Sequence, residues 1–280
     1  MKLKDYKIED AQHKNEVIVS WIITHACQEN CGYCISPNKK SEITDLATHM
    51  LIQNKMISNG VSKIRYIGGE PLLVKHLDCL IREASNSGID TRLSTNGIAL
   101  TQERFDQIKD SLNSVAFPYE SLNDDLNKYI RCSNNHSQII TDRIKMAKQV
   151  KGLGVLVNTC VHKENIDYLE DLAYHLNDLG VDQWKLRKFS NSSGRGAVKN
   201  SDRFDITEEE FNNVVNKLKS KGLLMDVAGR LPKKIYTRLM ISPQGELYRM
   251  VGKEEDFVHY GNIVKDDLNI KKIYERDRCD

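Results

Sequence analysis

The sequence predicts an α/β protein: a partial barrel of six βα units, followed by a small C-terminal α+β extension. Short apolar runs rich in β-branched residues alternate with segments of helical periodicity, which is the pattern of βα units around a parallel sheet. A length of 280 residues suits one barrel with an appendage. Glycine follows several of the helical segments, where a left-handed helix cap is favoured.

The barrel is predicted to occupy residues 1–190, with all six βα units between residues 17 and 190. The apolar runs predict strands at Val17–Thr24, Lys63–Ile67, Thr91–Thr95, Ser114–Tyr119, Val155–Val161 and Gln183–Phe189. Helices are predicted between these strands at Thr44–Asn59, Val74–Ser87, Gln102–Lys109, Gln138–Gly152 and Ile166–Leu179.

The extension is predicted to occupy residues 191–280. Ser, Gly and Asn are frequent from Asn191 to Asp205, which marks a loop or linker. Thr207 and Glu210 have the spacing of a capping box, which begins a helix. Pro243-Gln244-Gly245 separates two apolar runs, and this arrangement predicts a β-hairpin.

The composition is typical of a soluble, cytoplasmic protein. Hydrophobic residues make up 40% of the chain and charged residues 29%. The 41 basic and 39 acidic residues leave a net charge of +2, which favours neither a nucleic-acid polymer nor an anionic membrane as partner. Residues 1–16 lack the apolar segment of a signal peptide, and the run around Val17–Ile23 is too short to cross a bilayer.

Three of the seven cysteines, Cys27, Cys31 and Cys34, lie within eight residues, directly after the first predicted strand. Such clustering favours a metal site over disulfides. Thiolates hold iron–sulfur clusters, and three ligands on a [4Fe–4S] cube leave one iron open to a small molecule. A structural zinc site or a ferredoxin cluster would need a fourth ligand, and His25 is too close in sequence to serve. The remaining cysteines are scattered singly, at Cys79, Cys132, Cys160 and Cys279.

The spacing Cys-x3-Cys-x2-Cys, with the aromatic Tyr33 before the last cysteine, resembles the signature of the radical S-adenosylmethionine (SAM) superfamily. Gly68-Gly69-Glu70-Pro71, after the second predicted strand, resembles the family motif that receives the SAM amino group. Ser94-Thr95-Asn96-Gly97, after the third, resembles the segment that contacts the SAM ribose. The resemblance covers residues 17 to 190 and implies a TIM-like partial barrel, one [4Fe–4S] cluster on Cys27, Cys31 and Cys34, and SAM as cofactors.

The two further motifs also have a physical interpretation. A glycine pair lets backbone N–H groups approach a ligand, and Glu70 offers an acceptor for an ammonium group. Taken alone, Gly68 and Gly69 would indicate a turn, and Ser94 and Asn96 a polar strand end. All of them follow predicted strands, and the carboxyl ends of strands are where α/β barrels keep their active sites.

The resemblance implies a reaction type. The reduced cluster would pass an electron to SAM and release a 5'-deoxyadenosyl radical, which takes a hydrogen atom from the substrate. A flavodoxin- or ferredoxin-type reductant would supply the electron. Tyr33 is expected near the adenine, and Arg131 is expected to bind the SAM carboxylate or a substrate phosphate. The alternative for Arg131 is a solvated cation at a helix end.

Basic side chains are expected inside the barrel mouth. Strand side chains alternate between the two faces of a sheet, so Lys63 and Arg65 share one face of the second strand. The matching faces of the fifth and sixth strands carry Asn158, Lys185 and Arg187. These residues, Lys63, Arg65, Asn158, Lys185 and Arg187, are the candidate substrate site, because converging cations form a local anion site.

The basic set resembles that of the viperin group, radical SAM enzymes that dehydrate nucleoside triphosphates. Lys63, Arg131 and Lys185 fall at positions that bind phosphate in that group. Leu156 and Gln183 depart from it, because a lysine and an arginine are expected there.

Other segments resemble peptide-modifying radical SAM enzymes. The stretch from Arg187 to Gly196 is one of them. Ile241–Tyr248 and Tyr260–Ile263 resemble a SPASM-type extension, in which a cysteine is expected where Met250 stands. The extension is therefore interpreted as a SPASM-like remnant without cluster cysteines.

Together these patterns predict a radical SAM enzyme that acts on a small anionic substrate, a nucleotide or sugar, in a biosynthetic pathway. Modification of a ribosomally made peptide is the alternative. A third hypothesis is a catalytically inactive SAM- or cluster-binding protein, or an electron carrier. The sequence assigns no catalytic residue and does not name the bond that is changed.

Overall fold

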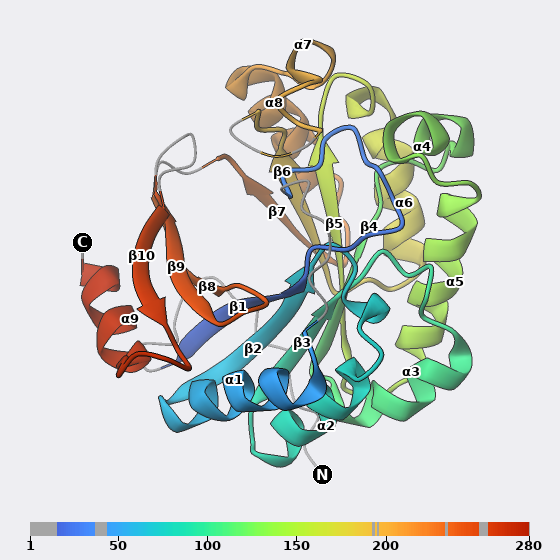
Figure 1. The fold of residues 1–280 in the computed structure, drawn as a ribbon. Helices are drawn as coiled ribbons and strands as arrows, with labels where there is room; N and C mark the ends of the chain where they lie inside the picture. Colours follow the sequence, from blue (N-terminus) through green and yellow to red (C-terminus); the bar gives the residue numbers. More distant parts are fainter. Residues whose placement is uncertain are drawn as a thin grey trace.

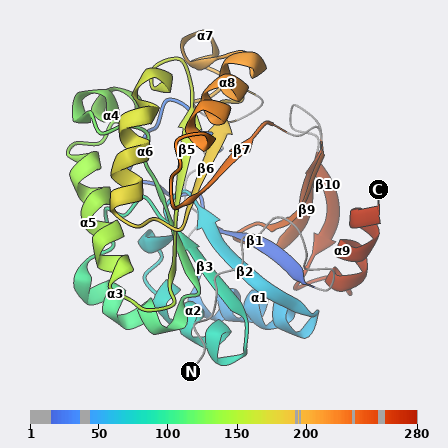
Figure 2. The same cartoon turned by 180° about the vertical axis from the view of Figure 1, so that it is seen from behind.

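The computed structural model describes residues 16–36, 44–191, 194, 196–232, 235–251 and 257–279. These residues form one curved sheet of ten strands, with helices along its outer side (Figures 1 and 2). The order of the strands is β10-β9-β8-β1-β2-β3-β4-β5-β6-β7, so the sheet does not close and β10 and β7 are its edges. Residues 1–15, Arg195 and the side chain of Met250, which entered the sequence predictions, lie outside the described part.

The strands are β1 Val17–Thr24, β2 Val61–Gly68, β3 Asp90–Ser94, β4 Ser114–Pro118, β5 Gly154–Val161, β6 Gln183–Lys188, β7 Asp226–Arg230, β8 Ile235–Ile241, β9 Glu246–Val251 and β10 Phe257–Asn262. The helices are α1 Leu46–Ser58, α2 Leu77–Asn86, α3 Gln102–Ile108, α4 Asp124–Arg131, α5 His136–Lys148, α6 Leu169–Asp178, α7 Ser201–Phe204, α8 Glu208–Lys219 and α9 Ile270–Cys279.

Strands β1 to β7 are parallel, each paired with its neighbour in sequence. This arrangement and the solved structures described below confirm the predicted α/β partial barrel. The final residues extend both edges of the same sheet: β7 pairs parallel with β6, and β8 pairs parallel with β1. The predicted division at residue 190 stays a prediction, since the extension shares its sheet with the barrel.

The predicted capping box and hairpin of the extension are confirmed, whereas the segment predicted as a loop, residues 191–205, contains the short helix α7. Strands β8 and β9 form the predicted antiparallel hairpin, and β10 adds to it. At the start of α8 the Thr207 hydroxyl accepts from the Glu210 N–H at 3.1 Å, and the Glu210 carboxylate accepts from the Thr207 N–H at 2.7 Å. This is the capping box that begins the helix.

The two faces of the sheet differ in chemistry. Val19 and Trp21 of β1, and Ile64 and Tyr66 of β2, are fully buried against the helices. The Tyr66 hydroxyl donates to the Gln53 side chain of α1 at 2.8 Å. Because side chains alternate along a strand, the neighbouring positions face the concave side of the sheet. The polar set predicted for the barrel interior therefore has the expected parity.

Within the described ranges, no helix is both long and apolar enough to cross a membrane.

Candidate functional site

The three sequence motifs meet at the carboxyl ends of β1, β2 and β3. The loop that carries the clustered cysteines follows β1. Two backbone bonds attach the end of β2 to this loop: the Gly69 N–H donates to the Thr24 carbonyl at 2.8 Å, and the Glu70 N–H to the Ala26 carbonyl at 2.7 Å. The Gln28 amide donates to the Asn96 side chain at 3.2 Å, which joins the loop to the end of β3.

The glycine pair is required by this close approach. A Cβ atom on Gly68 would lie 2.2 Å from the Thr24 carbonyl oxygen, and one on Gly69 would lie 2.1 Å from the Ala26 carbonyl oxygen. Such separations are far inside van der Waals contact. Gly68 also has a φ of +148°, which favours glycine. The pair therefore lets β2 pass directly beside the cysteine loop.

Glu70 connects two of the motifs through its side chain, which is fully buried. One carboxylate oxygen accepts from the Thr95 hydroxyl at 2.6 Å and the Leu72 N–H at 3.0 Å, and the other accepts from the Asn96 N–H at 2.7 Å. Burial raises the pKa of this carboxyl, and the three hydrogen bonds work against that rise. The side chain thus fixes the position of Asn96; its contact with the SAM amino group stays a prediction.

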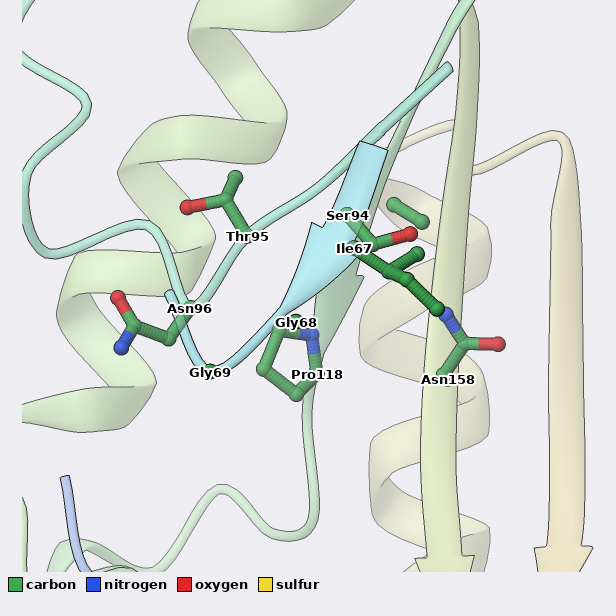
Figure 3. A pocket seen from close by; sticks show the side chains of 9 residues that line it. Ile67, Gly68, Gly69, Ser94, Thr95, Asn96, Pro118 and Asn158 are labelled. Atoms are coloured by element: carbon green, nitrogen blue, oxygen red, sulfur yellow. The ribbon is translucent and has the colours of Figure 1, made fainter. Parts of the chain in front are cut away.

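A cavity of about 200 Å³ opens where these strands end (Figure 3). It is lined by Ile67, Gly68, Gly69, Ser94, Thr95, Asn96, Ala116, Pro118 and Asn158. Four of the residues expected to bind SAM and one expected to bind substrate are in this set. The lining by Ala116 and Pro118 was not predicted, because small apolar residues at a strand end carry no chemical signal.

Within the described residues, the clustered cysteines Cys27, Cys31 and Cys34 form no disulfide, and each is partly buried. Backbone N–H groups of Glu29 and Ser36 donate to the sulfur atoms of Cys27 and Cys34, both at 3.4 Å. Burial raises the pKa of the Cys31 thiol to about 12, so its conversion to thiolate at neutral pH depends on a bound metal. Three clustered thiols, two of which accept backbone N–H donors, fit the ligand set of a [4Fe–4S] cube with one open iron.

A structural zinc site, the alternative for the clustered cysteines, would need several ligands that converge on one metal ion. In the part of the chain that the structure describes, no three His, Cys, Asp or Glu side chains converge on a point where one metal ion could sit. The ligands of a cube bind different irons, so they need not converge in this way.

Arg131 is buried, with only 2% of its surface exposed. Its guanidinium donates to the Glu29 carboxylate at 2.5 and 3.3 Å and to the Glu120 carboxylate at 2.7 Å. The alternative of a solvated cation at a helix end is therefore wrong. Sequence reasoning missed Glu29 and Glu120, because no local pattern pairs Arg131 with a carboxylate that lies 102 residues away in one case and 11 in the other.

Tyr33 belongs to the same buried group. Its hydroxyl is hydrogen-bonded to the Arg131 guanidinium, and its ring centroid lies 5.9 Å from that of His162 and 6.5 Å from that of Phe204. Burial raises the pKa of the phenol well above its usual value. Tyr33 is not one of the residues that line the cavity.

The structure separates the five candidate substrate residues. Lys185 of β6 is 5% exposed and is the register partner of Asn158, which lines the cavity. Arg187, two residues further along β6, is exposed. Lys63 is five residues before Gly68, about 16 Å away along β2, and forms a salt bridge with Asp90 at 2.9 Å. The structure therefore does not place Lys63 at the barrel mouth with Lys185 and Arg187.

Along β2, Arg65 lies between Lys63 and the cavity residue Gly68, and it is 6% exposed. Its register partner on β3 is Arg92, which is 5% exposed. Arg92 has the same parity as Ser94, which lines the cavity, so it faces the concave side as well. Alternation along the third strand places Arg92 on this face, and Arg92 was not among the predicted residues.

Comparison with known protein families identifies the class. The model of the radical SAM superfamily matches residues 21–176, which is more than half of the chain. The chain belongs to this superfamily. It is therefore a radical SAM enzyme, with a [4Fe–4S] cluster and SAM as its cofactors.

Two curated relatives indicate different substrates. An S-adenosylmethionine-dependent nucleotide dehydratase from Flammeovirga pacifica is 27% identical over 271 residues, covering 92% of this chain and 89% of that protein. A PqqA peptide cyclase from Bradyrhizobium diazoefficiens is 28% identical over 167 residues, covering 58% of this chain and 43% of that protein.

Solved structures share the fold. SuiB from Streptococcus suis, bound to the precursor peptide SuiA, superposes with a TM-score of 0.75 at 14% identity, over 94% of this chain and 65% of SuiB. The anSMEcpe structure with bound AdoMet gives a TM-score of 0.73 at 11% identity, over 91% of this chain and 80% of that one. At such identities the likeness shows the fold alone.

Proposed function

We propose that this radical SAM enzyme takes a hydrogen atom from a small anionic substrate, a nucleotide or a sugar, in a biosynthetic pathway. The observation that carries the proposal is the place of Lys185, a buried cation on the concave side of the sheet beside the cavity residue Asn158. The nucleotide dehydratase that matches nearly the whole chain supports the same substrate class.

The cavity lined by residues of β2 to β5 and the segments that follow them is the proposed SAM-binding site. Gly68 and Gly69 bring the backbone close to the ligand, Ser94 and Asn96 present polar groups, and Glu70 holds Asn96 in place. When bound, the cluster on Cys27, Cys31 and Cys34 and the SAM molecule supply the one-electron cleavage that yields the 5'-deoxyadenosyl radical. The protein orients both and shields them from water.

Lys185 is the proposed substrate anchor. Adjacent strands lie about 4.8 Å apart, so the Lys185 and Asn158 backbones are neighbours at the level of the cavity. Charge-assisted hydrogen bonds strengthen where water is excluded, since the local dielectric constant is low. A phosphate or carboxylate bound to Lys185 would lie close to the proposed SAM-binding site.

Modification of a ribosomally made peptide is the second candidate. The relative named as a PqqA peptide cyclase favours it. We also propose that the enzyme works in the cytoplasm, where thiols stay reduced, and that a flavodoxin- or ferredoxin-type protein delivers the electron.

The test compares wild type with Lys185→Ala across a panel of nucleotides and phosphosugars. We expect one anion to stimulate release of 5'-deoxyadenosine by the wild type, and the variant to bind it about tenfold or more weakly, since a charged hydrogen bond contributes about 1.5–3 kcal/mol. Lys188→Ala is the matched control, because Lys188 is on the same strand with opposite parity and pairs with Asp205 at 3.0 Å. Stimulation by an uncharged peptide, and by none of the anions, would replace this proposal with the peptide alternative.

A further inference from the structure

We infer that the side-chain oxygen of Gln183, the first residue of β6, accepts a hydrogen bond from a sugar hydroxyl group of the substrate. Together with Lys185 it selects an anion that carries a hydroxylated ring, which is the chemistry of a phosphosugar or of the ribose phosphate part of a nucleotide. The inference rests on the proposed function, and it adds a second contact to the substrate that Lys185 anchors.

The amide of Gln183 is fully buried, and a neighbouring carboxylate fixes its orientation. Its Nε2 atom donates to the Asp226 carboxylate of β7 at 2.6 Å. An ionised carboxylate only accepts hydrogen bonds, so the nitrogen must face Asp226 and the oxygen, Oε1, must point away from it. In the described part of the chain, no donor lies within hydrogen-bonding distance of Oε1. Native structures leave few buried acceptors unsatisfied, so this oxygen is a place where the donor of a ligand is expected.

The register of the sheet places Gln183 at the level of the cavity. Trp184 packs in the helix-side core, so Gln183 faces the concave side. Gln183 is the register partner of Leu156 on β5, and the same row continues through Ala116 to Ser94. Ala116 and Ser94 line the cavity that is the proposed SAM-binding site. A sugar ring bound at Gln183 therefore lies in the same row of the barrel as the group that takes its hydrogen atom.

Lys185 and Gln183 bind different ends of such a ligand. They are two residues apart on the same face of β6, about 6.6 Å between their Cα atoms. The Lys185 ammonium group attracts a phosphate, whereas Oε1 of Gln183 has no hydrogen to donate and disfavours a phosphate oxygen beside it. A hydroxyl group does have a hydrogen to donate. The two side chains therefore assign the phosphate to Lys185 and a ring hydroxyl, several bonds away, to Gln183.

Burial determines the order of these contacts. Gln183 has no exposed surface, so a ligand reaches Oε1 only after a neighbouring side chain moves. Lys185, the next residue on this face, has the long flexible side chain that can turn toward an anion. The anion therefore binds first, and the hydroxyl contact follows.

The experiment is a double-mutant cycle between the Gln183 side chain and the ligand hydroxyl, measured as binding to the holoenzyme with cluster and SAM and without reductant. The probes are the common ribonucleoside 5'-triphosphates and ribose 5-phosphate, each compared with its deoxy analogues. We expect the wild type to bind one deoxy analogue about fivefold or more weakly than its parent, since Oε1 then stays unsatisfied. Gln183→Met should narrow this difference to about twofold or less, because the variant has no carbonyl to lose.

Gln138→Met is the matched control, because Gln138 donates the same kind of bond to Asp142 at 2.9 Å in an exposed pair on α5. It should keep the wild-type difference between parent and deoxy probes. Gln183→Met leaves the Asp226 carboxylate without this donor and can fail to fold. In that case the double variant Gln183→Met/Asp226→Asn takes its place in the cycle.

Equal binding of parent and deoxy probes by the wild type would overturn the inference. So would an unchanged difference in the Gln183 variants, or an equal weakening of all probes, which shows a purely structural role. If Lys185→Ala weakens binding of the anion while one of these results is obtained, only the contact of Gln183 is wrong. If no anion binds the wild type, the proposed function fails together with this inference.

Discussion

At the scale of single residues, the site depends on two glycines, whose lack of a side chain allows a close backbone contact, and on the Glu70 carboxylate. Gly69 carries no Cβ, and this lets the Ala26 carbonyl of the cysteine loop lie where a side chain would begin. Glu70 then bonds to the next strand and fixes Asn96. The pair Gly68-Gly69 and the Glu70 carboxylate therefore set the distance between the cysteine loop and the proposed SAM-binding site.

The first residue-scale prediction is that Gly69→Ala destabilises the protein and disrupts the site. The added methyl group meets backbone oxygen at 2.1 Å, so the loop must move, at a cost of about 1–3 kcal/mol or more. Urea unfolding and SAM binding measure the two effects. Gly88→Ala is the control: its φ of +79° carries a left-handed penalty of about 1–2 kcal/mol, but nothing lies within 4 Å. We expect SAM binding to survive there; equal losses in both variants would contradict a role for the close approach.

Residue types with strong local signals were predicted, and residues that act through long-range partners were not. The two motifs located four of the cavity residues, and the structure brings the cysteine loop beside them. Glu29 and Glu120 were missed, because an ion pair that forms only through tertiary packing, here over 102 and 11 residues, leaves no local sequence pattern. Lys63 was expected at the mouth because parity gives the face of a strand and not the height along it.

At the scale of elements, the contact between α1 and α2 contains a buried histidine. His49 of α1 is 1% exposed, and its Nδ1 atom lies 2.8 Å from the Nε2 atom of His76, which precedes α2. Burial, with a smaller contribution from His76, lowers the pKa of His49 to about 4. Burial likewise lowers the pKa of His162, beside Tyr33 and Phe204, to about 3.

These pKa values predict a loss of stability in acid. Below pH 6.5 the unfolded chain binds a proton at each histidine while the folded chain does not, so the free energy of unfolding falls as the pH falls. The loss is about 1.4 kcal/mol per pH unit for each histidine and continues toward pH 4 for His49. Urea unfolding between pH 8 and pH 5 should show this slope, and His49→Gln should reduce it. Parallel curves for wild type and variant would contradict the assignment.

Elements with strong periodicity were predicted from the sequence, and short or polar ones were not. The predicted bounds of β1 agree with the structure, and α8 begins at its capping box. Helix α4 was missed because its eight residues, DDLNKYIR, are mostly polar. Strand β7 was missed because only two of its five residues, DVAGR, have apolar side chains. Both elements are stabilised by tertiary contacts, α4 by the cysteine loop and β7 by β6.

At the scale of the whole molecule, the near-neutral composition conceals an uneven distribution of charge. The helix-facing side of the barrel strands is apolar, whereas Arg65, Arg92 and Lys185 lie buried on the concave side. The alternating pattern predicted this polarity for Arg65 and Lys185, and Arg92 was not part of the prediction. The open sheet was also predicted, but the sharing of one sheet by barrel and extension was not, because strand pairing across more than two hundred residues has no sequence signal.

The most direct test of radical SAM chemistry on these cysteines is the formation of 5'-deoxyadenosine by anaerobically reconstituted protein given SAM and a reductant. We expect about four irons per chain, as one cube requires, and slow release of 5'-deoxyadenosine without substrate. Cys31→Ala should abolish both, while Cys79→Ala, which alters a free cysteine on α2, should retain them. Continued cleavage of SAM by Cys31→Ala, or a wild type that holds the cluster but never cleaves SAM, would contradict this assignment.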